Sequence, residues 1–307
     1  MVAAIVTSLV VLVAAGVAVW YFTRGPGQNT ATPGPSGSES VSISSSLTTG
    51  PSNTASESPS ASPSESADDP TGSNVLAHRG GDEKYPLQTF ESLTSAAEDG
   101  FAVETDVRWT SDNEAVIVHD EDAELGLRCD QPYQVSKTTW KVLSENCRSF
   151  SKDGKSYPLA TYETVMQGLA GHRSRVYVEV KVDQTAKQNQ EFLDVIRNNG
   201  LSDRTVVTSS DLGRLAEMED LAPDLPRMLF VSKEVPASQL AEENLWAVAV
   251  NQKVATESYI SELQEIGLIV IVWTLNEEQA WEKARSVGAD KVLTDKPKAY
   301  TEWLAKQ

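Results

Sequence analysis

The sequence predicts an α/β fold, a closed (β/α)8 or TIM barrel with an insertion after the second strand. From Asn74 onward, short apolar runs rich in β-branched residues alternate with helix-like stretches, which is typical of βα units around a parallel sheet. Eight such runs fall within about 230 residues, the usual size of a closed barrel. The predicted strands are residues 75–78, 102–109, 176–181, 205–209, 227–231, 246–250, 268–275 and 291–294.

Helix-like stretches separate most of these predicted strands. Several of them end on glycine, which commonly stands just past the last turn of a helix. We therefore expect helices within residues 89–100, 211–221, 256–267 and 276–288.

The second predicted strand is followed by an additional apolar run. Turn-forming residues occupy 111–113, and the run EAVIVHD follows at 114–120. We expect this run to fold back on the second strand as a hairpin partner, which returns His119 to the level of the carboxylates on that strand. Residues 121–159 then form an insertion before the third strand, and long insertions of this kind usually serve binding or cover a site.

Residues 1–24 are predicted to form a membrane anchor or signal segment. The uncharged apolar run at 2–22 is long enough, as a helix, to cross a bilayer core of roughly 30 Å. It lacks a basic n-region and ends in the aromatic residues Trp20, Tyr21 and Phe22, which favours an uncleaved transmembrane helix over a cleaved signal peptide. Arg24 alone opposes an outward orientation, and large domains are exported largely regardless of such a local charge.

Residues 25–73 are predicted to be a disordered linker. The segment is dominated by Ser, Thr, Pro, Gly and Ala, so it cannot bury enough apolar surface to offset its chain entropy. We interpret it as a flexible spacer between the anchor and a catalytic domain at 74–307. The expected location is the cell membrane, single-pass, with the domain extracellular; secretion after signal cleavage is the alternative.

Charge and cysteine content narrow the class of protein further. A formal net charge of −18 argues against nucleic acid as a partner, because nucleic acid is bound by clustered Lys and Arg. The two cysteines, Cys129 and Cys147, lack the C-x2-C spacing of a zinc site. In an oxidising compartment we expect them to form one disulfide, with two free thiols as the alternative.

Candidate catalytic groups stand at the ends of the predicted strands, where barrel enzymes carry their active sites. His78 and Arg79 end the first strand, and His119 ends the hairpin run. The pairs Glu104/Asp106 and Glu179/Lys181 have i, i+2 spacing, which directs both side chains of a pair to one face of a strand. These seven side chains are therefore expected to converge.

The chemistry of this set indicates a phosphoester site. Three close carboxylates, Glu104, Asp106 and Glu179, repel one another unless protonated or bridged by a cation, and an all-oxygen set favours one Ca²⁺ or Mg²⁺ over Zn²⁺. Arg79 and Lys181 suit binding of phosphate oxygens. Two histidines with pKa values near neutral can take and return a proton.

The ordered set of motifs resembles the glycerophosphodiester phosphodiesterase family over residues 75–300. The motifs are His78-Arg79-Gly80, Glu104/Asp106, His119-Asp120, Glu179/Lys181, Val272-Trp273-Thr274-Leu275-Asn276 and Thr294-Asp295-Lys296-Pro297. The resemblance implies a barrel that hydrolyses glycerophosphodiesters, its small-molecule substrates, to sn-glycerol 3-phosphate and an alcohol. It implies Glu104, Asp106 and Glu179 on the metal, His78 and His119 as catalytic acid and base, and Arg79, Lys181 and Trp273 at the substrate.

One motif departs from the family pattern. Members usually carry P-E-N-T after the first strand, whereas this chain reads Pro86-Leu87-Gln88-Thr89, without the carboxylate and amide in their usual places. Two alternatives stay open. A phospholipase D or sphingomyelinase D relative would share the barrel and the site, and a catalytically silent phosphodiester or cell-wall binding module would share the fold alone.

Overall fold

The computed structural model describes residues 74–307 of this chain. The predicted anchor at 1–24 and linker at 25–73 lie outside the described residues. Within residues 74–307, every helix is too short or too polar to cross a membrane.

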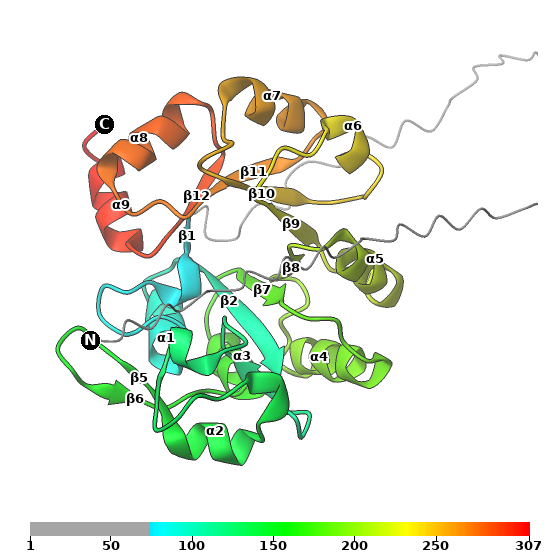
Figure 1. Ribbon diagram of the computed structural model, residues 1–307. Helices are drawn as coiled ribbons and strands as arrows, with labels where there is room; N and C mark the ends of the chain where they lie inside the picture. Colours follow the sequence, from blue (N-terminus) through cyan, green and yellow to red (C-terminus); the bar gives the residue numbers. More distant parts are fainter. Residues whose placement is uncertain (1–73) are drawn as a thin grey trace, which may run out of the picture. The chain divides into compact units, whose positions relative to one another are not determined.

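Within the described part of the chain, eight parallel strands form a closed barrel, as predicted (Figure 1). The barrel closes because β1 pairs with both β2 and the last strand, β12. Its strands are β1 (Val75–Ala77), β2 (Ala102–Trp109), β7 (Val176–Val180), β8 (Thr205–Ser209), β9 (Arg227–Val231), β10 (Ala247–Asn251), β11 (Ile269–Trp273) and β12 (Lys291–Thr294).

Helices cover the outside of the barrel (Figure 1). The first turns of five of these helices are fixed by a side chain that accepts a backbone N–H, a contact that stabilises a helix end by about 1 kcal/mol. Thr89, Thr161, Thr185, Asp211 and Thr256 make such caps. The helices are α1 (Phe90–Glu98), α3 (Tyr162–Ala170), α4 (Ala186–Asn198), α5 (Leu212–Leu221), α6 (Ala237–Leu240), α7 (Glu257–Glu265), α8 (Glu278–Ser286) and α9 (Pro297–Leu304).

The strand ends differ slightly from the prediction at the site. The run at 75–78 ends one residue early, because His78, Arg79 and Gly80 form a 3-10 turn, η1. The run at 268–275 is shortened to β11, since Leu275 turns back to bond the carbonyl of Leu293. Polar groups at strand ends thus lie in turns, free to face a common point.

Side chains pack on both faces of the sheet, as expected for parallel strands. Inside the barrel, Leu76, Tyr177, Met228 and Ile271 are fully buried together with neighbouring apolar side chains. The alternate residues of the same strands pack outward against the helices. This packed interior closes the barrel below the site and leaves only its upper rim for chemistry.

The insertion folds as a small lobe. β3 (Ala115–Ile117) pairs antiparallel with β2, with Val107 opposite Ile117, so the predicted hairpin is confirmed. The strands β4 (Arg128–Cys129), β5 (Cys147–Phe150) and β6 (Ser156–Tyr157) form a second sheet beside α2 (Trp140–Asn146). Two 3-10 turns, η2 (Ala123–Leu125) and η3 (Val135–Lys137), complete the lobe, and a disulfide joins Cys129 to Cys147.

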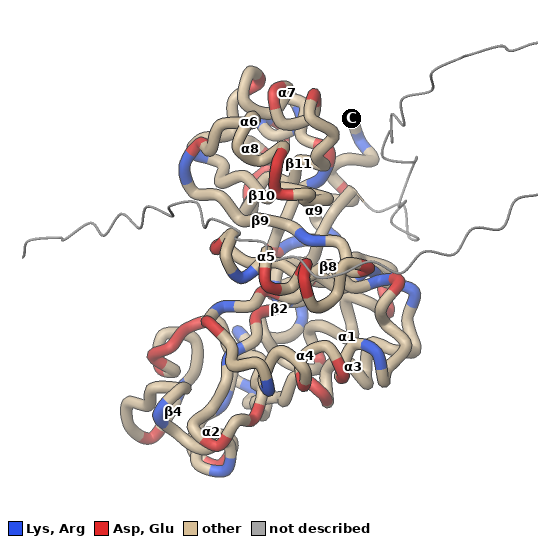
Figure 2. The backbone as a smooth tube through the Cα atoms, turned by 90° about the vertical axis from the view of Figure 1, so that its right-hand side faces the viewer, with Lys and Arg blue, Asp and Glu red and all other residues tan. Residues whose placement is uncertain are grey.

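Basic and acidic residues are interspersed along the described part of the chain. Figure 2 shows Lys and Arg scattered among Asp and Glu along the described elements.

Candidate functional site

The predicted site residues meet at one cavity at the carboxyl ends of the strands. The cavity measures about 180 Å³. Seven of the eight predicted side chains line it, all but Asp106, together with residues at the ends of β8, β9 and β12. The lining residues are His78, Arg79, Glu104, His119, Glu179, Lys181, Ser210, Phe230, Ser232, Trp273 and Leu293.

The three predicted metal ligands form a buried carboxylate cluster. Glu104 and Asp106 point the same way from β2, and Asp106 is in register with Glu179 on β7. Oxygen atoms of the three groups lie within 4.8 Å of one another. The structure therefore brings together the oxygen ligands that a hard divalent cation requires.

The pKa values of this cluster show the cost of holding three carboxylates together. Burial and then the neighbouring charge of Asp106 raise the pKa of Glu104 well above its usual value. Burial and Asp106 likewise raise the pKa of Glu179 to about 7. Burial would also raise the pKa of Asp106, but the charges of Arg79 and Lys181 outweigh it and lower that pKa. A negative charge is thus fixed on Asp106, while its neighbours favour a proton or a cation.

One oxygen of the cluster is well suited to a cation. Asp106 Oδ1 is buried and accepts no hydrogen bond from any described residue. Its nearest ion-pair partner is Lys181 Nζ at 3.4 Å. A buried carboxylate oxygen without a donor is costly unless a cation compensates it, so the residues present fit a divalent ion.

The two predicted phosphate-binding residues flank the carboxylates. Arg79 Nε lies 3.1 Å from Asp106 Oδ2, and Lys181 Nζ lies 3.1 Å from Glu179 Oε1. Both side chains line the cavity and are only partly exposed. They add positive charge where an anionic substrate group would enter.

The turn after β1 holds Arg79 in place. Arg79 has a left-handed backbone, with φ of 51°. Its N–H donates to Glu104 Oε2 at 3.1 Å, and its carbonyl accepts from Ser92 Oγ at 3.1 Å. Gly80 follows with φ of 83°, and a Cβ there would come within 2.5 Å of the Ser92 carbonyl carbon. The H-R-G sequence therefore has a steric reason: only glycine permits the close approach of this turn to α1.

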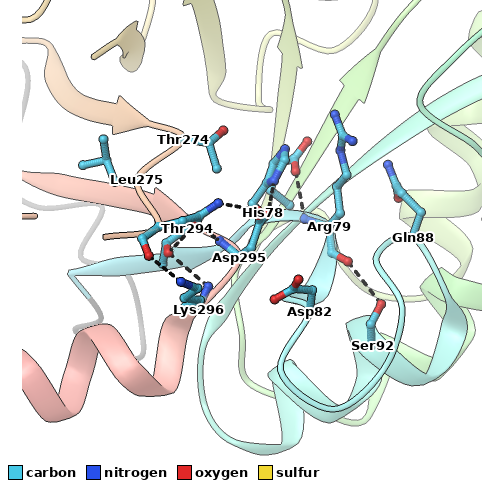
Figure 3. A network of polar contacts seen from close by, with 12 residues as sticks. His78, Arg79, Asp82, Gln88, Ser92, Thr274, Leu275, Thr294, Asp295 and Lys296 are labelled. Carbon is cyan, nitrogen blue, oxygen red and sulfur yellow. Dashed lines mark hydrogen bonds and ion pairs between the residues drawn. The ribbon is translucent and has the colours of Figure 1, made fainter. Parts of the chain in front are cut away.

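His78 is oriented by a carboxylate that follows the last strand of the barrel, β12. Its Nδ1 lies 2.5 Å from Asp295 Oδ1 (Figure 3). Asn276 Nδ2 donates to the other oxygen, Asp295 Oδ2, at 2.6 Å. The bond to His78 lowers the pKa of Asp295, although burial opposes this shift. With Nδ1 bonded in this way, Nε2 of His78 is left to exchange a proton.

His119 has a similar arrangement across the cavity. Its Nδ1 lies 2.9 Å from Asp120 Oδ1. Burial lowers the pKa of His119, and the charge of Asp106 opposes this shift. A neutral imidazole that keeps Nε2 free is suited to accept a proton near neutral pH.

Gln88 occupies the position where the family pattern has its amide. It is buried with φ of 60°, its Nε2 donates to Asp106 Oδ2, and its Oε1 accepts from Thr105 Oγ1 at 2.7 Å. The prediction that the amide is lost is therefore wrong, because the side chain of Gln88, longer than the asparagine of the family pattern, still brings an amide to the carboxylate cluster. Leu87 instead lines a separate groove beside the insertion.

Trp273 forms one wall of the cavity. Its Nε1 donates to the Ala249 carbonyl at 2.9 Å, and the ring of Phe230 meets it edge-on at 5.6 Å between centroids. These contacts fix an aromatic surface beside the carboxylates.

Several residues of the site had no role predicted from the sequence. Asp295, Asn276 and Asp120 stand inside the motifs that resemble the family, so their positions gave a signal. Phe230 and Ser232 end β9 and follow it, and their location after a barrel strand was the available clue. No motif pointed to Arg108, which contacts His119.

Known proteins with similar sequences identify the family of this chain. The model of the glycerophosphoryl diester phosphodiesterase family matches residues 78–299. Lysophospholipase D GDPD3 of Homo sapiens is 24% identical over 271 residues, which cover 74% of this chain and 84% of the relative.

Solved structures share the fold. A glycerophosphodiester phosphodiesterase from Parabacteroides distasonis superposes with a TM-score of 0.64 at 23% identity, covering 76% of this chain and 97% of that one. A phosphodiesterase from Oleispira antarctica, solved in complex with the product sn-glycerol-3-phosphate, gives 0.67 at 20% identity with the same coverage. The family match spans most of the barrel, and the chain belongs to the glycerophosphoryl diester phosphodiesterase family, as a phosphoric diester hydrolase.

Proposed function

We propose that this protein hydrolyses glycerophosphodiesters to sn-glycerol 3-phosphate and an alcohol. The observation that carries the proposal is the pair of carboxylate-oriented histidines, His78 and His119, on one cavity with a buried carboxylate cluster. The Oleispira antarctica relative was solved with sn-glycerol-3-phosphate, which supports this product class. A cavity of about 180 Å³ suits a glycerol phosphate group.

The histidines act as an acid–base pair in this proposal. One takes the proton from the attacking hydroxyl, which belongs to water or is the neighbouring glycerol hydroxyl of the substrate. The other gives a proton to the departing alcohol oxygen. If the glycerol hydroxyl attacks, a cyclic phosphate forms first, and water then opens it to glycerol 3-phosphate with the two histidines in exchanged roles. The carboxylates of Asp295 and Asp120 hold the two rings and stabilise the protonated form of each.

Arg79 and Lys181 bind the phosphoryl oxygens and stabilise the charge that develops on them. Glu104, Asp106 and Glu179 hold one divalent cation, Ca²⁺ or Mg²⁺. When bound, this ion supplies additional stabilisation of phosphoryl charge. Trp273 packs against the glycerol part of the substrate.

The test is release of glycerol 3-phosphate from glycerophosphocholine by the purified full-length protein. It is run with Ca²⁺, with Mg²⁺ and with chelator alone. We expect release that depends on one of the two metals and that is lost in His78→Ala and His119→Ala by several orders of magnitude. Equal release in chelator would contradict the metal requirement, and no release with either metal would contradict the reaction.

A second candidate reaction is cleavage of lysophospholipids. A groove of about 510 Å³ adjoins the catalytic cavity, and the two share Ser210, Phe230 and Ser232. Leu212, Val235 and Pro236 add apolar surface to it, which would suit an acyl chain. The human relative named lysophospholipase D favours the same substrate class. Turnover of lysophosphatidylcholine without turnover of glycerophosphocholine would select this reaction over the first.

We also propose that the domain acts outside the cell, attached through the apolar segment at 2–22. That segment is long enough to span a bilayer. The disulfide between Cys129 and Cys147 is typical of exported proteins and supports the location. Protease added to intact cells should remove the domain from the membrane fraction; full protection of the domain would contradict the proposal.

A further inference from the structure

His119 lies beyond the regular part of the strand that carries it. The ladder between β2 and β3 has its last pair at Val107 and Ile117. His119 follows two residues later, in a bend with no strand pairing. A catalytic ring at such a position needs another contact to fix its backbone, because a shift of about 1 Å costs roughly 100-fold in rate.

Arg108 provides that contact. From β2, its Nε donates to the carbonyl oxygen of His119 at 2.7 Å. Its Nη1 lies 3.1 Å from Glu121 Oε2. The guanidinium of Arg108 therefore bonds both His119, at the cavity, and Glu121, two residues later. It thus spans the bend that carries His119.

Glu121 extends the connection into the insertion. Its Oε1 accepts hydrogen bonds from the N–H and the hydroxyl of Ser136. Its carbonyl accepts from Val135 N at 2.9 Å, and Val135 is fully buried in the core of the insertion. The position of His119 is thereby tied to the packed interior of the lobe.

The burial of Arg108 makes this contact strong. Only 13% of its side chain is exposed, and Glu121 is 34% exposed. Charge-assisted hydrogen bonds from a guanidinium are about twice as strong as neutral ones, and a mostly buried guanidinium keeps its partners because leaving them unmade is costly. Arg108 does not line the catalytic cavity, so it acts through His119 and has no contact with substrate in this structure.

We propose that Arg108 is a positioning residue for this reaction, which holds His119 at the cavity and couples it to the insertion through Glu121. The inference rests on the proposed function, since it requires His119 to transfer a proton. It gives the insertion a role in catalysis: residues 121–136 brace the bend from which His119 projects.

The test is a double-mutant cycle in the full-length protein. Arg108→Gln is made alone and in a His119→Ala background, and hydrolysis of radiolabelled glycerophosphocholine is followed with saturating metal. We expect Arg108→Gln alone to lower kcat by about 100-fold with KM within about threefold, because geometry at His119 changes and substrate contacts do not. In the His119→Ala background the same substitution should change kcat by less than about threefold.

Two further variants separate positioning from general loss of structure. Arg108→Lys keeps one donor to the His119 carbonyl and should recover about tenfold of the loss. Arg128→Gln is the control for loss of a guanidinium: Arg128 lies in the insertion with its guanidinium over the Phe150 ring, it makes no hydrogen bond to His119 among the described residues, and the variant should keep the kcat of the natural protein. Metal affinity should be equal in all variants.

Distinct outcomes overturn the inference and the proposed function. Equal reductions by Arg108→Gln in both backgrounds, or a kcat above half that of the natural protein, would show that Arg108 does not act through His119. A fully active His119→Ala variant would instead remove the acid–base role on which the inference rests.

Discussion

His78 Nδ1 and Asp295 Oδ1 lie 2.5 Å apart although 217 residues separate them in the chain. Their closeness is a product of barrel closure. β1 and β12 pair in parallel, with Ala77 opposite Thr294 at their ends. His78 directly follows Ala77, and Asp295 directly follows Thr294. The strand that ends the barrel thus orients the histidine that follows its first strand, and Asn276 holds the carboxylate from the other side.

Replacement of Asp295 by Asn should reduce kcat by about 100-fold or more. The amide cannot stabilise a protonated His78, and it presents a donor where the ring needs an acceptor. KM and the unfolding transition should change little, because the side chain remains similar in shape. Steady-state kinetics and thermal unfolding check both expectations.

The exposed Asp224 gives a control for the loss of one carboxylate. Asp224→Asn should leave kcat unaltered. An Asp295→Asn variant with the kcat of the natural protein would show that the short contact does not contribute to catalysis.

The carboxylates of the site could be predicted from sequence because their geometry is local. The i, i+2 spacing of Glu104 and Asp106 fixes both side chains on one face of a strand, whatever the rest of the fold does. His78, Glu179 and Lys181 followed from the rule that barrel strands end at the active site. These residues line or adjoin one cavity in the structure.

The partners of the histidines depend on contacts that no local pattern encodes. Asp295 reaches His78 through barrel closure, and Arg108 reaches His119 across a bend whose shape depends on the insertion. The helices α3 and α4 were also not assigned, although Thr161 and Thr185 cap them. α3 directly follows the long insertion, which interrupts the regular alternation that identified the other units, whereas α4 lies between β7 and β8 in an uninterrupted βα unit.

Glu104→Gln should separate metal binding from folding. Burial and then the charge of Asp106 raise the pKa of Glu104, so a charged carboxylate is costly there, and glutamine removes that charge with little change of shape. We expect metal affinity to fall by at least about tenfold, with metal-free stability within about 1 kcal/mol of the natural protein. Calorimetric metal titration and urea unfolding in chelator measure the two quantities. Unchanged metal affinity would exclude Glu104 as a ligand.

Gly80 and Gly100 form a matched pair for testing the turn after β1. Both have positive φ, 83° and 86°, but a Cβ at Gly80 would meet the α1 backbone at 2.5 Å, whereas Gly100 has open space. Gly100→Ala should cost about 1–2 kcal/mol of unfolding free energy, from the left-handed backbone alone. Gly80→Ala should cost clearly more and also lower kcat, since Arg79 precedes it. Equal losses in urea unfolding would show that the close approach to α1 is not limiting.

The pKa of Glu179 makes stability and metal binding depend on pH in opposite directions. The pKa is about 7 in the folded protein against an ordinary value of 4.5, because of burial and the charge of Asp106. The folded state therefore binds a proton more tightly than the unfolded state. The stability that Glu179 contributes through this proton is fully present below pH 4.5 and is lost as the pH rises through about 7. In chelator, the melting temperature should thus fall between pH 6 and pH 8.

Metal binding must displace the same proton from Glu179. Below pH 7, affinity for Ca²⁺ or Mg²⁺ should fall by up to about tenfold per pH unit, and above it the affinity should level off. Calorimetric titrations at pH 6, 7 and 8 measure this slope, and saturating metal should abolish the fall in melting temperature. The Glu179→Gln variant should bind the metal more weakly, and its metal affinity should depend much less on pH near pH 7. If affinity in the natural protein were the same at all three pH values, Glu179 would not be the group that exchanges a proton for the metal.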